Sequence, residues 1–232
     1  MRKLTAIALA ILFAAPVAAE EVDRTLDAAS DGAVHVSNIA GSVAVDGWNR
    51  DEVHVKGTLG RNVEELIFER DGDRVTVKVK VPKRGGRGIA SDLRISVPRG
   101  SSLDVATVSA DIDVTAVQGE QKLEAVSGDI NTEAYESNVQ AGTVSGDVRI
   151  EGNGKDTETS GTTVSGDVTL RDLAGEVSAE SVSGDVIIDG GSFDRSEFNT
   201  VNGDIEFEAE LRNDGRLSAE TVNGGVDLRF EG

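Results

Sequence analysis

The chain has 232 residues, a formal net charge of −19 at pH 7 and only 3% aromatic residues. It contains no cysteine, which excludes disulfides, thiolate metal sites and cysteine nucleophiles. A surface this acidic repels nucleic acid and anionic lipid, so neither is expected as a partner, and the scarcity of aromatic residues predicts a core built from Val, Ile and Leu.

Residues 1–19 have the pattern of a signal peptide. Arg2 and Lys3 form a basic start, residues 6–15 are apolar, and Val17-Ala18-Ala19 is a small-residue cleavage site. The apolar run is shorter than the ~20 residues that a membrane-spanning helix needs. We therefore expect cleavage after residue 19 and export, with the protein periplasmic or secreted and associated with the cell surface. No transmembrane segment is expected after cleavage.

One motif dominates the second half of the chain. It consists of Val, then Ser or Asn, then Gly, Asp, and Val or Ile; the first copy has Ala in place of Gly, and the last has a second Gly in place of Asp. The seven copies begin at Val108, Val126, Val144, Val164, Val182, Val201 and Val222. Successive copies lie about 18–21 residues apart, and a period near twenty is typical of a stacked repeat architecture.

Apolar and polar residues alternate on both sides of each motif. A second apolar residue follows two positions after the motif's final aliphatic residue in every copy except the second, which has Thr132 there. This period of two indicates short β-strands, and nothing recurs at helical spacing.

Two strand arrangements fit this pattern. Gly-Asp could form a two-residue hairpin turn, which gives an antiparallel meander. Alternatively, each repeat is one coil of a β-solenoid, with equivalent residues stacked ~4.8 Å apart. The solenoid is favoured because stacking explains why the same residue type recurs at the same place. The sequence therefore predicts an all-β, single-chain parallel β-solenoid with coils of about 18–21 residues. We expect regular repeats over 101–232 and a less regular N-terminal β segment over 20–100.

The order of these features resembles the bacterial putative-adhesin family, a β-strand repeat domain of unknown function. The resemblance rests on alternating Val residues near the N-terminus, a strand ending in Val97-Pro98, and the serial Ser-Gly-Asp-Val/Ile coils, and it covers residues 30–230. It implies a right-handed β-helix-like fold in exported or envelope-associated proteins. The family offers no established catalytic residues to transfer.

The Asp residues of the motif would form a column in a solenoid. Stacked carboxylates ~4.8 Å apart repel one another by about 1 kcal/mol per pair even in water. A ladder of calcium sites would relieve that repulsion. The favoured interpretation is that each Asp caps backbone N–H groups of its own turn. The candidate residues are Asp111, Asp129, Asp147, Asp167, Asp185 and Asp204.

The column of Ser and Asn residues next to the Asp column offers no catalytic site. A serine nucleophile needs a neighbouring base, and the two histidines, His35 and His54, are distant in the sequence. Two histidines without a third ligand also make a poor metal site. We therefore expect no catalytic, cofactor-binding or metal-binding residues outside the Asp column.

These observations together predict an exported, non-catalytic β-solenoid that presents an acidic face to an envelope or surface ligand, either protein or glycan. The alternative is a carbohydrate-active β-helix lyase or hydrolase, which would need a groove with converging acids and a basic residue. The final coil has no polar cap after it, so end-to-end self-association is a third expectation.

Overall fold

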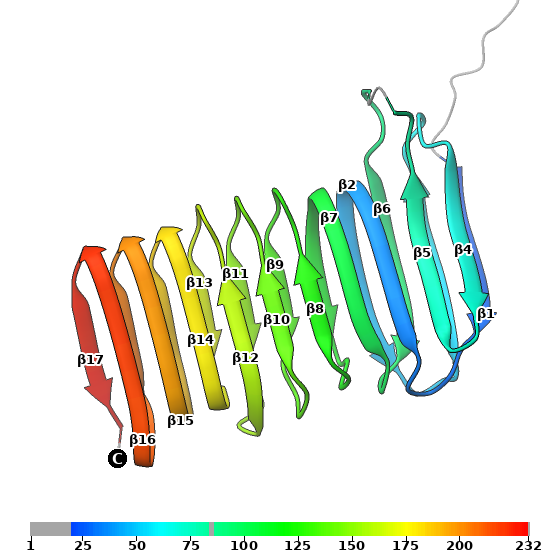
Figure 1. The fold of residues 1–232 in the computed structure, drawn as a ribbon. Helices are drawn as coiled ribbons and strands as arrows, with labels where there is room; N and C mark the ends of the chain where they lie inside the picture. The colour runs from blue at the N-terminus through cyan, green and yellow to red at the C-terminus, as the bar shows by residue number, and fades with distance from the viewer. Residues whose placement is uncertain (1–19, 84–85, 232) are drawn as a thin grey trace, which may run out of the picture.

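The computed structural model describes residues 20–83 and 86–231 as a rod of stacked β-coils (Figure 1). The predicted signal peptide at 1–19 lies outside the described residues. No helix within the described ranges has the length and hydropathy needed to cross a bilayer.

The rod has two sheet faces, because each coil contributes one strand to each face. Face A and face B are the names used below for the two series of neighbouring strands. Some strands continue around the corner of the coil and therefore belong to both faces. Face A contains β4 (Glu65–Asp71), β5 (Arg74–Lys80), the first part of β2 (Ala33–Trp48), the first part of β7 (Ser102–Thr115), β8 (Gln121–Glu124), β10 (Val139–Gly142), β12 (Asp156–Thr162), β14 (Ala174–Ser183), and the second parts of β15 (Val186–Asn202) and β16 (Ile205–Asn223). Face B contains β1 (Glu20–Asp27), β3 (Glu52–Leu59), β6 (Ser91–Pro98), the second parts of β2 and β7, β9 (Ile130–Glu133), β11 (Val148–Glu151), β13 (Val168–Arg171), the first parts of β15 and β16, and β17 (Val226–Phe230).

Equivalent residues of successive repeats pair in parallel and in register. On face B, Val148 lies between Ile130 of the preceding coil and Val168 of the next. On face A, Val139 lies between Gln121 and Thr159 in the same way. This confirms the predicted parallel β-solenoid and excludes the antiparallel meander for the repeats.

The space between the faces is filled by inward-pointing aliphatic side chains, as the composition predicts. Ile112, Ile130 and Ile150, for example, are fully buried. Toward β17 the interior becomes aromatic, since Phe193 and Phe198 both pack against Phe207, with ring centroids 5.9 and 6.0 Å apart. The core is therefore a largely apolar strip along the rod, interrupted by a few buried polar side chains.

Thr132, the exception in the apolar pattern, is buried and hydrogen-bonded. Its hydroxyl donates to the side-chain carbonyl of Gln121 at 2.5 Å. The Gln121 amide in turn donates to the backbone carbonyls of Val117 and Glu133. Because a buried polar group is costly unless it is paired, the two polar residues occur together across the interior.

The N-terminal segment departs from a simple continuation of the stack. β2 forms a parallel coil that lies between the β5/β6 coil and β7, so the stacking order differs from the chain order (Figure 1). β1 and β4, the outermost strands, pair antiparallel with β3 and β5. Residues 20–100 therefore combine two parallel coils with an antiparallel end layer.

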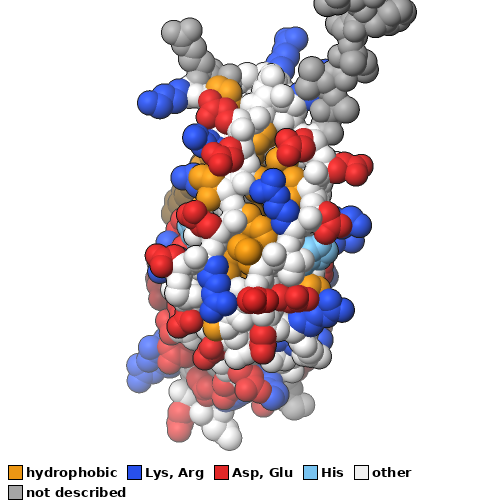
Figure 2. Space-filling view, turned by 90° about the vertical axis from the view of Figure 1, so that its right-hand side faces the viewer, with side chains coloured by type: hydrophobic (Ala, Val, Ile, Leu, Met, Phe, Trp, Pro, Cys, Tyr) orange, Lys and Arg blue, Asp and Glu red, His pale blue; other side chains and the backbone are white. Residues whose placement is uncertain are grey.

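Charged side chains close this N-terminal end. Arg24 lies on the same side of β1 as Val22 and Leu26, so an exposed cation interrupts the apolar side of the end strand. Arg70 of β4 donates to the backbone carbonyl of Asp27 at the end of β1, 3.1 Å away, and so links the two faces. Viewed end-on, charged side chains of both signs surround the apolar centre (Figure 2). The end layer thus works as a polar cap.

The close contact between successive coils requires a glycine at the third position of the motif. A Cβ added to Gly166 would lie 2.0 Å from the carbonyl oxygen of Gly146 in the preceding coil. We therefore predict that Gly166→Ala lowers the free energy of unfolding by about 3 kcal/mol, because the coils must separate to admit the methyl group. Equilibrium unfolding in urea measures the change.

Gly225→Ala provides the matched control, because the nearest atom to its added Cβ would be Asp204 Oδ1 at 3.6 Å, an ordinary contact. Equal urea midpoints for the two variants would contradict the predicted close packing.

Candidate functional site

The repeated motifs lie at one corner of the rod, where the chain passes from face A to face B. We call this line of seven motifs the motif edge. The strands before and after each motif fix its position, because they are held in register with those of the neighbouring coils. Isolated parallel bridges link Ser127, Ser145, Ser165 and Ser183 directly across the coils. The motif edge is therefore as regular as the sheets on either side.

The Asp column forms a continuous hydrogen-bonded ladder along the motif edge. Oδ1 of each Asp accepts the backbone N–H of the equivalent residue in the next coil. The six bonds run from Asp129 N–H to Asp111 (3.0 Å), Asp147 to Asp129 (2.9 Å), Asp167 to Asp147 (3.0 Å), Asp185 to Asp167 (2.8 Å), Asp204 to Asp185 (2.8 Å) and Gly225 to Asp204 (2.7 Å). All six predicted residues are thus brought together in one line.

The ladder differs from the expected capping of each Asp's own turn. The accepted N–H lies 18–21 residues further along the chain, so each carboxylate joins two coils instead of closing one. One oxygen of every carboxylate is occupied in this way, and the second oxygen of Asp147 accepts from Arg149 at 2.7 Å. No group of three or more His, Asp or Glu residues within 20–83 and 86–231 is arranged to hold a metal ion. The calcium ladder stays an untested prediction.

A second column of donors, which the sequence analysis did not identify, lies immediately before the motif valines. Each hydroxyl donates to the backbone carbonyl of the residue at the glycine position, in the preceding coil for all but the first member. The donors are Thr107, Thr143, Thr163, Ser181, Thr200 and Thr221. The sequence does contain a signal for this column, because a Ser or Thr precedes the motif valine in every copy except the one with Ala125.

The motif valines are exposed although they are apolar. Their exposed fractions lie between 40% and 49%, with 73% for the last copy, at Val108, Val126, Val144, Val164, Val182, Val201 and Val222. The neighbouring Ser and Asn side chains are also exposed: Ser127, Ser145, Ser165, Ser183, Asn202 and Asn223. The motif edge therefore exposes two parallel columns to solvent: an apolar column of valines and a hydrogen-bonding column of Ser and Asn residues.

The two histidines lie on different faces and do not meet. His35, on β2 in face A, is 3.1 Å from Asp104 of β7. His54, on β3 in face B, is 2.8 Å from Asp23 of β1 and stacks against Trp48. Neither histidine pairs with a motif serine, so the structure does not assemble a Ser-His pair.

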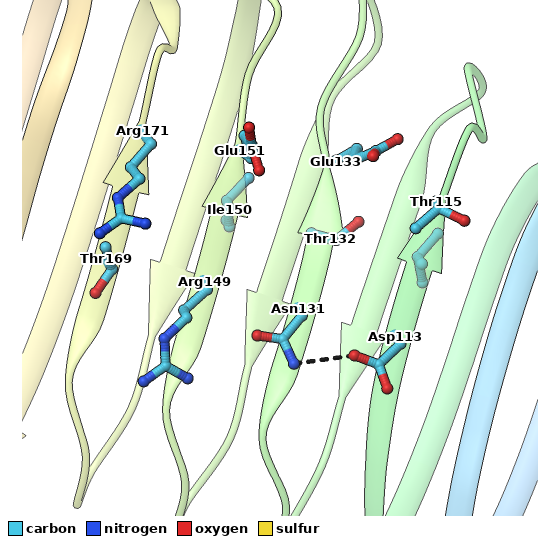
Figure 3. Close-up of a pocket in the computed structure, with 11 residues that line it drawn as sticks. Asp113, Thr115, Asn131, Thr132, Glu133, Arg149, Ile150, Glu151, Thr169 and Arg171 are labelled. Carbon is cyan, nitrogen blue, oxygen red and sulfur yellow. Dashed lines mark hydrogen bonds between the residues drawn. The ribbon is translucent and has the colours of Figure 1, made fainter.

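A shallow groove on face B collects charges of both signs (Figure 3). Arg149 and Asn131 stand in one outward row with Asp113, and the Asn131 amide donates to the Asp113 carboxylate at 3.0 Å. Arg171 stands in the neighbouring row with Glu151. Arg149 is already paired with Asp147, and Arg171 lies 3.6 Å from Asp189. Both arginines of the groove are therefore engaged with aspartates that lie outside it.

The fold and the repeated motif edge define this chain as a parallel β-solenoid repeat protein. The family model Toastrack DUF4097 matches residues 42–232, and the chain belongs to this family. No curated protein matches the chain.

Several solved structures are similar to the chain. One is a putative cell adhesion protein from Clostridium sporogenes ATCC 15579, at 10% identity and a TM-score of 0.41, over 91% of this chain and 100% of that one. Another is a putative adhesin from Bacteroides fragilis NCTC 9343, at 9% identity and a TM-score of 0.49, over 90% and 97%. A putative lipid binding protein from Parabacteroides distasonis ATCC 8503 has 11% identity and a TM-score of 0.34, over 91% and 95%. These similarities do not identify a ligand for this chain.

One member of the Asp ladder, Asp147, makes stability depend on pH. The N–H of Asp167 and the Arg149 guanidinium together hold the pKa of Asp147 below its ordinary value of 3.8, against the opposing effect of burial. A hydrogen bond from Arg212 also lowers the pKa of Asp156, and one from His54 lowers the pKa of Asp23. A carboxyl with a lowered folded-state pKa stabilises the fold fully above its unfolded pKa, and this contribution is lost as pH falls through the folded pKa.

We therefore predict that the free energy of unfolding falls as pH is lowered below about 4, and that Asp147→Asn makes this fall shallower. The amide oxygen of the variant side chain can still accept the Asp167 N–H, but it does not titrate. Urea unfolding at a series of acid pH values measures the slope. Identical slopes for the variant and the parent would contradict a stabilising role for the ionised carboxylate.

Proposed function

We propose that this chain is an exported, non-catalytic, adhesin-like module of the cell envelope that binds an extended glycan along its motif edge. The observation that supports the proposal is the sevenfold recurrence of an exposed valine beside an exposed Ser or Asn. The stacking contacts between coils do not account for an apolar side chain at the exposed valine position.

The motif positions differ in what the stack requires of them. The glycine is fixed by its contact with the preceding coil, the Asp by its bond to the next coil, and the final aliphatic residue by its burial. Val164, in contrast, leaves 45% of its surface in solvent. Extended exposed apolar surface rimmed by polar residues is characteristic of interaction sites. Recurrence of an apolar side chain at a position that stays exposed therefore supports a binding role for this column.

The chemistry of the two columns favours a glycan over a protein segment. Valine side chains can pack on the apolar C–H faces of sugar rings, while Ser hydroxyls and Asn amides can exchange hydrogen bonds with sugar hydroxyls. The columns run along the rod with one pair per coil, so an extended polymer could meet the same chemistry repeatedly. Many weak contacts of this kind reinforce one another when they are linked.

A carbohydrate-active enzyme is the alternative function. The groove of Figure 3 would have to contain its active site. Its two arginines are engaged with Asp147 and Asp189 at 2.7 and 3.6 Å. The acids Glu133 and Glu151 occupy equivalent positions in successive coils of the same face. This repetition supports a surface of stacked columns over a dedicated pair of catalytic acids on opposite sides of a bond.

The test replaces the middle of the apolar column by its β-branched polar counterpart. We expect the triple variant V144T/V164T/V182T to bind at least about tenfold more weakly than the parent, because three apolar contacts are lost. Co-sedimentation with purified peptidoglycan sacculi and binding to an array of immobilised polysaccharides provide the measurement. Ile187→Thr, which alters a partly exposed aliphatic residue on face B, is the matched control.

Retained binding by Ile187→Thr with loss in the triple variant would support the motif edge as the site. Equal binding by the triple variant and the parent, or no binding to any of these probes, would overturn the proposal. Release of new reducing ends from a bound polysaccharide would overturn the non-catalytic part and favour the enzyme.

A further inference from the structure

The two ends of the rod are finished differently. The N-terminal end carries antiparallel strands, on which the exposed Arg24 and Arg70 share the side of the strand that also carries apolar residues. At the other end, no described strand lies beyond β17 and the second part of β16. Val226, Leu228 and Phe230, the residues of β17 that continue the buried columns, are 43%, 40% and 57% exposed. Over the described residues, the apolar strip between the sheets is therefore open at this end.

The edge of β17 that faces away from β16 carries backbone groups with no strand partner among the described residues. The N–H of Glu231 donates to Ala209 of β16, and the carbonyl of Gly225 accepts from Ile205 of β16. Because these groups alternate along a strand, Val226, Leu228 and Phe230 direct their N–H and C=O groups away from β16. An exposed edge of this kind is a template for another strand.

The sequence of β17 is complementary to itself when it pairs antiparallel. With Leu228 opposite Leu228 of a second copy, Val226 lies opposite Phe230 and Asp227 lies opposite Arg229. The inward residues would exchange backbone hydrogen bonds, and the Asp227–Arg229 pairs would occupy the close, non-hydrogen-bonded positions. Opposite charges therefore meet on the outer side of the paired segment, and apolar residues meet on the inner side.

The second part of β16, which forms the other face of the same coil, has the same property. Antiparallel pairing about Ser218 places Arg216 opposite Glu220 and Leu217 opposite Ala219 of the second copy. β1, at the opposite end of the rod, lacks this complementarity, because it carries Glu20, Glu21, Asp23, Arg24 and Asp27. A second copy in the reversed direction thus fits the open end better than the acidic N-terminal end of another rod.

We propose that two copies of this chain associate through their open ends, with β17 pairing antiparallel to β17 of the second copy about Leu228. The interface is isologous, so it closes as a dimer and does not propagate into a filament. It extends the two sheets and covers Leu228 and Phe230, the latter of which packs on Phe207 with ring centroids 5.6 Å apart. The interface is independent of the motif-edge ligand.

Charge reversal tests the proposed register. In Asp227→Arg, two arginines would face each other at each contact, and in Arg229→Asp, two aspartates would do so. The double variant D227R/R229D restores opposite charges in the same antiparallel register. Arg171→Asp changes the equivalent outward column on β13, inside the stack, and is the matched control. Sedimentation velocity of the full chain over a wide range of concentrations measures association, with circular dichroism as the check on folding.

We expect a concentration-dependent monomer–dimer equilibrium for the parent and at least about tenfold weaker association for each single variant of β17. The double variant and Arg171→Asp should associate like the parent. A parent that is monomeric at every concentration, or that forms species growing beyond the dimer, would overturn the proposal. Single variants that associate like the parent, or a folded double variant that stays monomeric, would also overturn it. If a single variant does not fold, the double variant decides the outcome.

Discussion

The contact between the glycine backbone of one coil and the glycine carbonyl of the preceding coil is the constraint on which this structure depends. A Cβ on Gly184 would lie 1.9 Å from the oxygen of Gly166, so the coils can approach only where side chains are absent. This approach brings the Asp167 carboxylate within 2.8 Å of the next Asp N–H and the Ser181 hydroxyl within 3.0 Å of the Gly166 carbonyl. Together these bonds satisfy backbone groups that a sharp corner would otherwise leave unpaired.

The same constraint explains which features the sequence could predict. The parallel solenoid, its period and its aliphatic interior follow from residues that recur because each stacks on its own copy, as with Val148 and Val168. The insertion of the β2 coil between β6 and β7 could not be predicted, because Val34 and Val36 have the same alternation in a parallel coil as Val53 and Val55 have in the antiparallel β3. Alternation determines which face a side chain occupies, and not which strand lies beside it.

Along the motif edge, the sequence analysis identified the residues of the Asp column but only part of its geometry. The Asp column is where the repeat places it, but its bonds join successive coils, because register brings the N–H of the next coil within reach of each carboxylate. The exposure of the motif valines was not predicted, since Val at a strand end is typical of a core position. The chain is thus a Toastrack DUF4097 solenoid whose internal positions are set by stacking. Among the described residues, its outward valines and the apolar residues of β17 are exposed to solvent and are not set by stacking on a following coil.

Amide hydrogen exchange along the motif edge tests the central account most directly. If the Asp ladder ties the coils together, the N–H groups of Asp147, Asp167 and Asp185 exchange as slowly as those of the neighbouring sheet strands, because opening them requires separation of two coils. The amide of Ser165 makes a useful comparison within the same corner, since it bonds backbone to backbone with Val144. Exchange of the three Asp amides at the rate of an unstructured peptide would contradict the account.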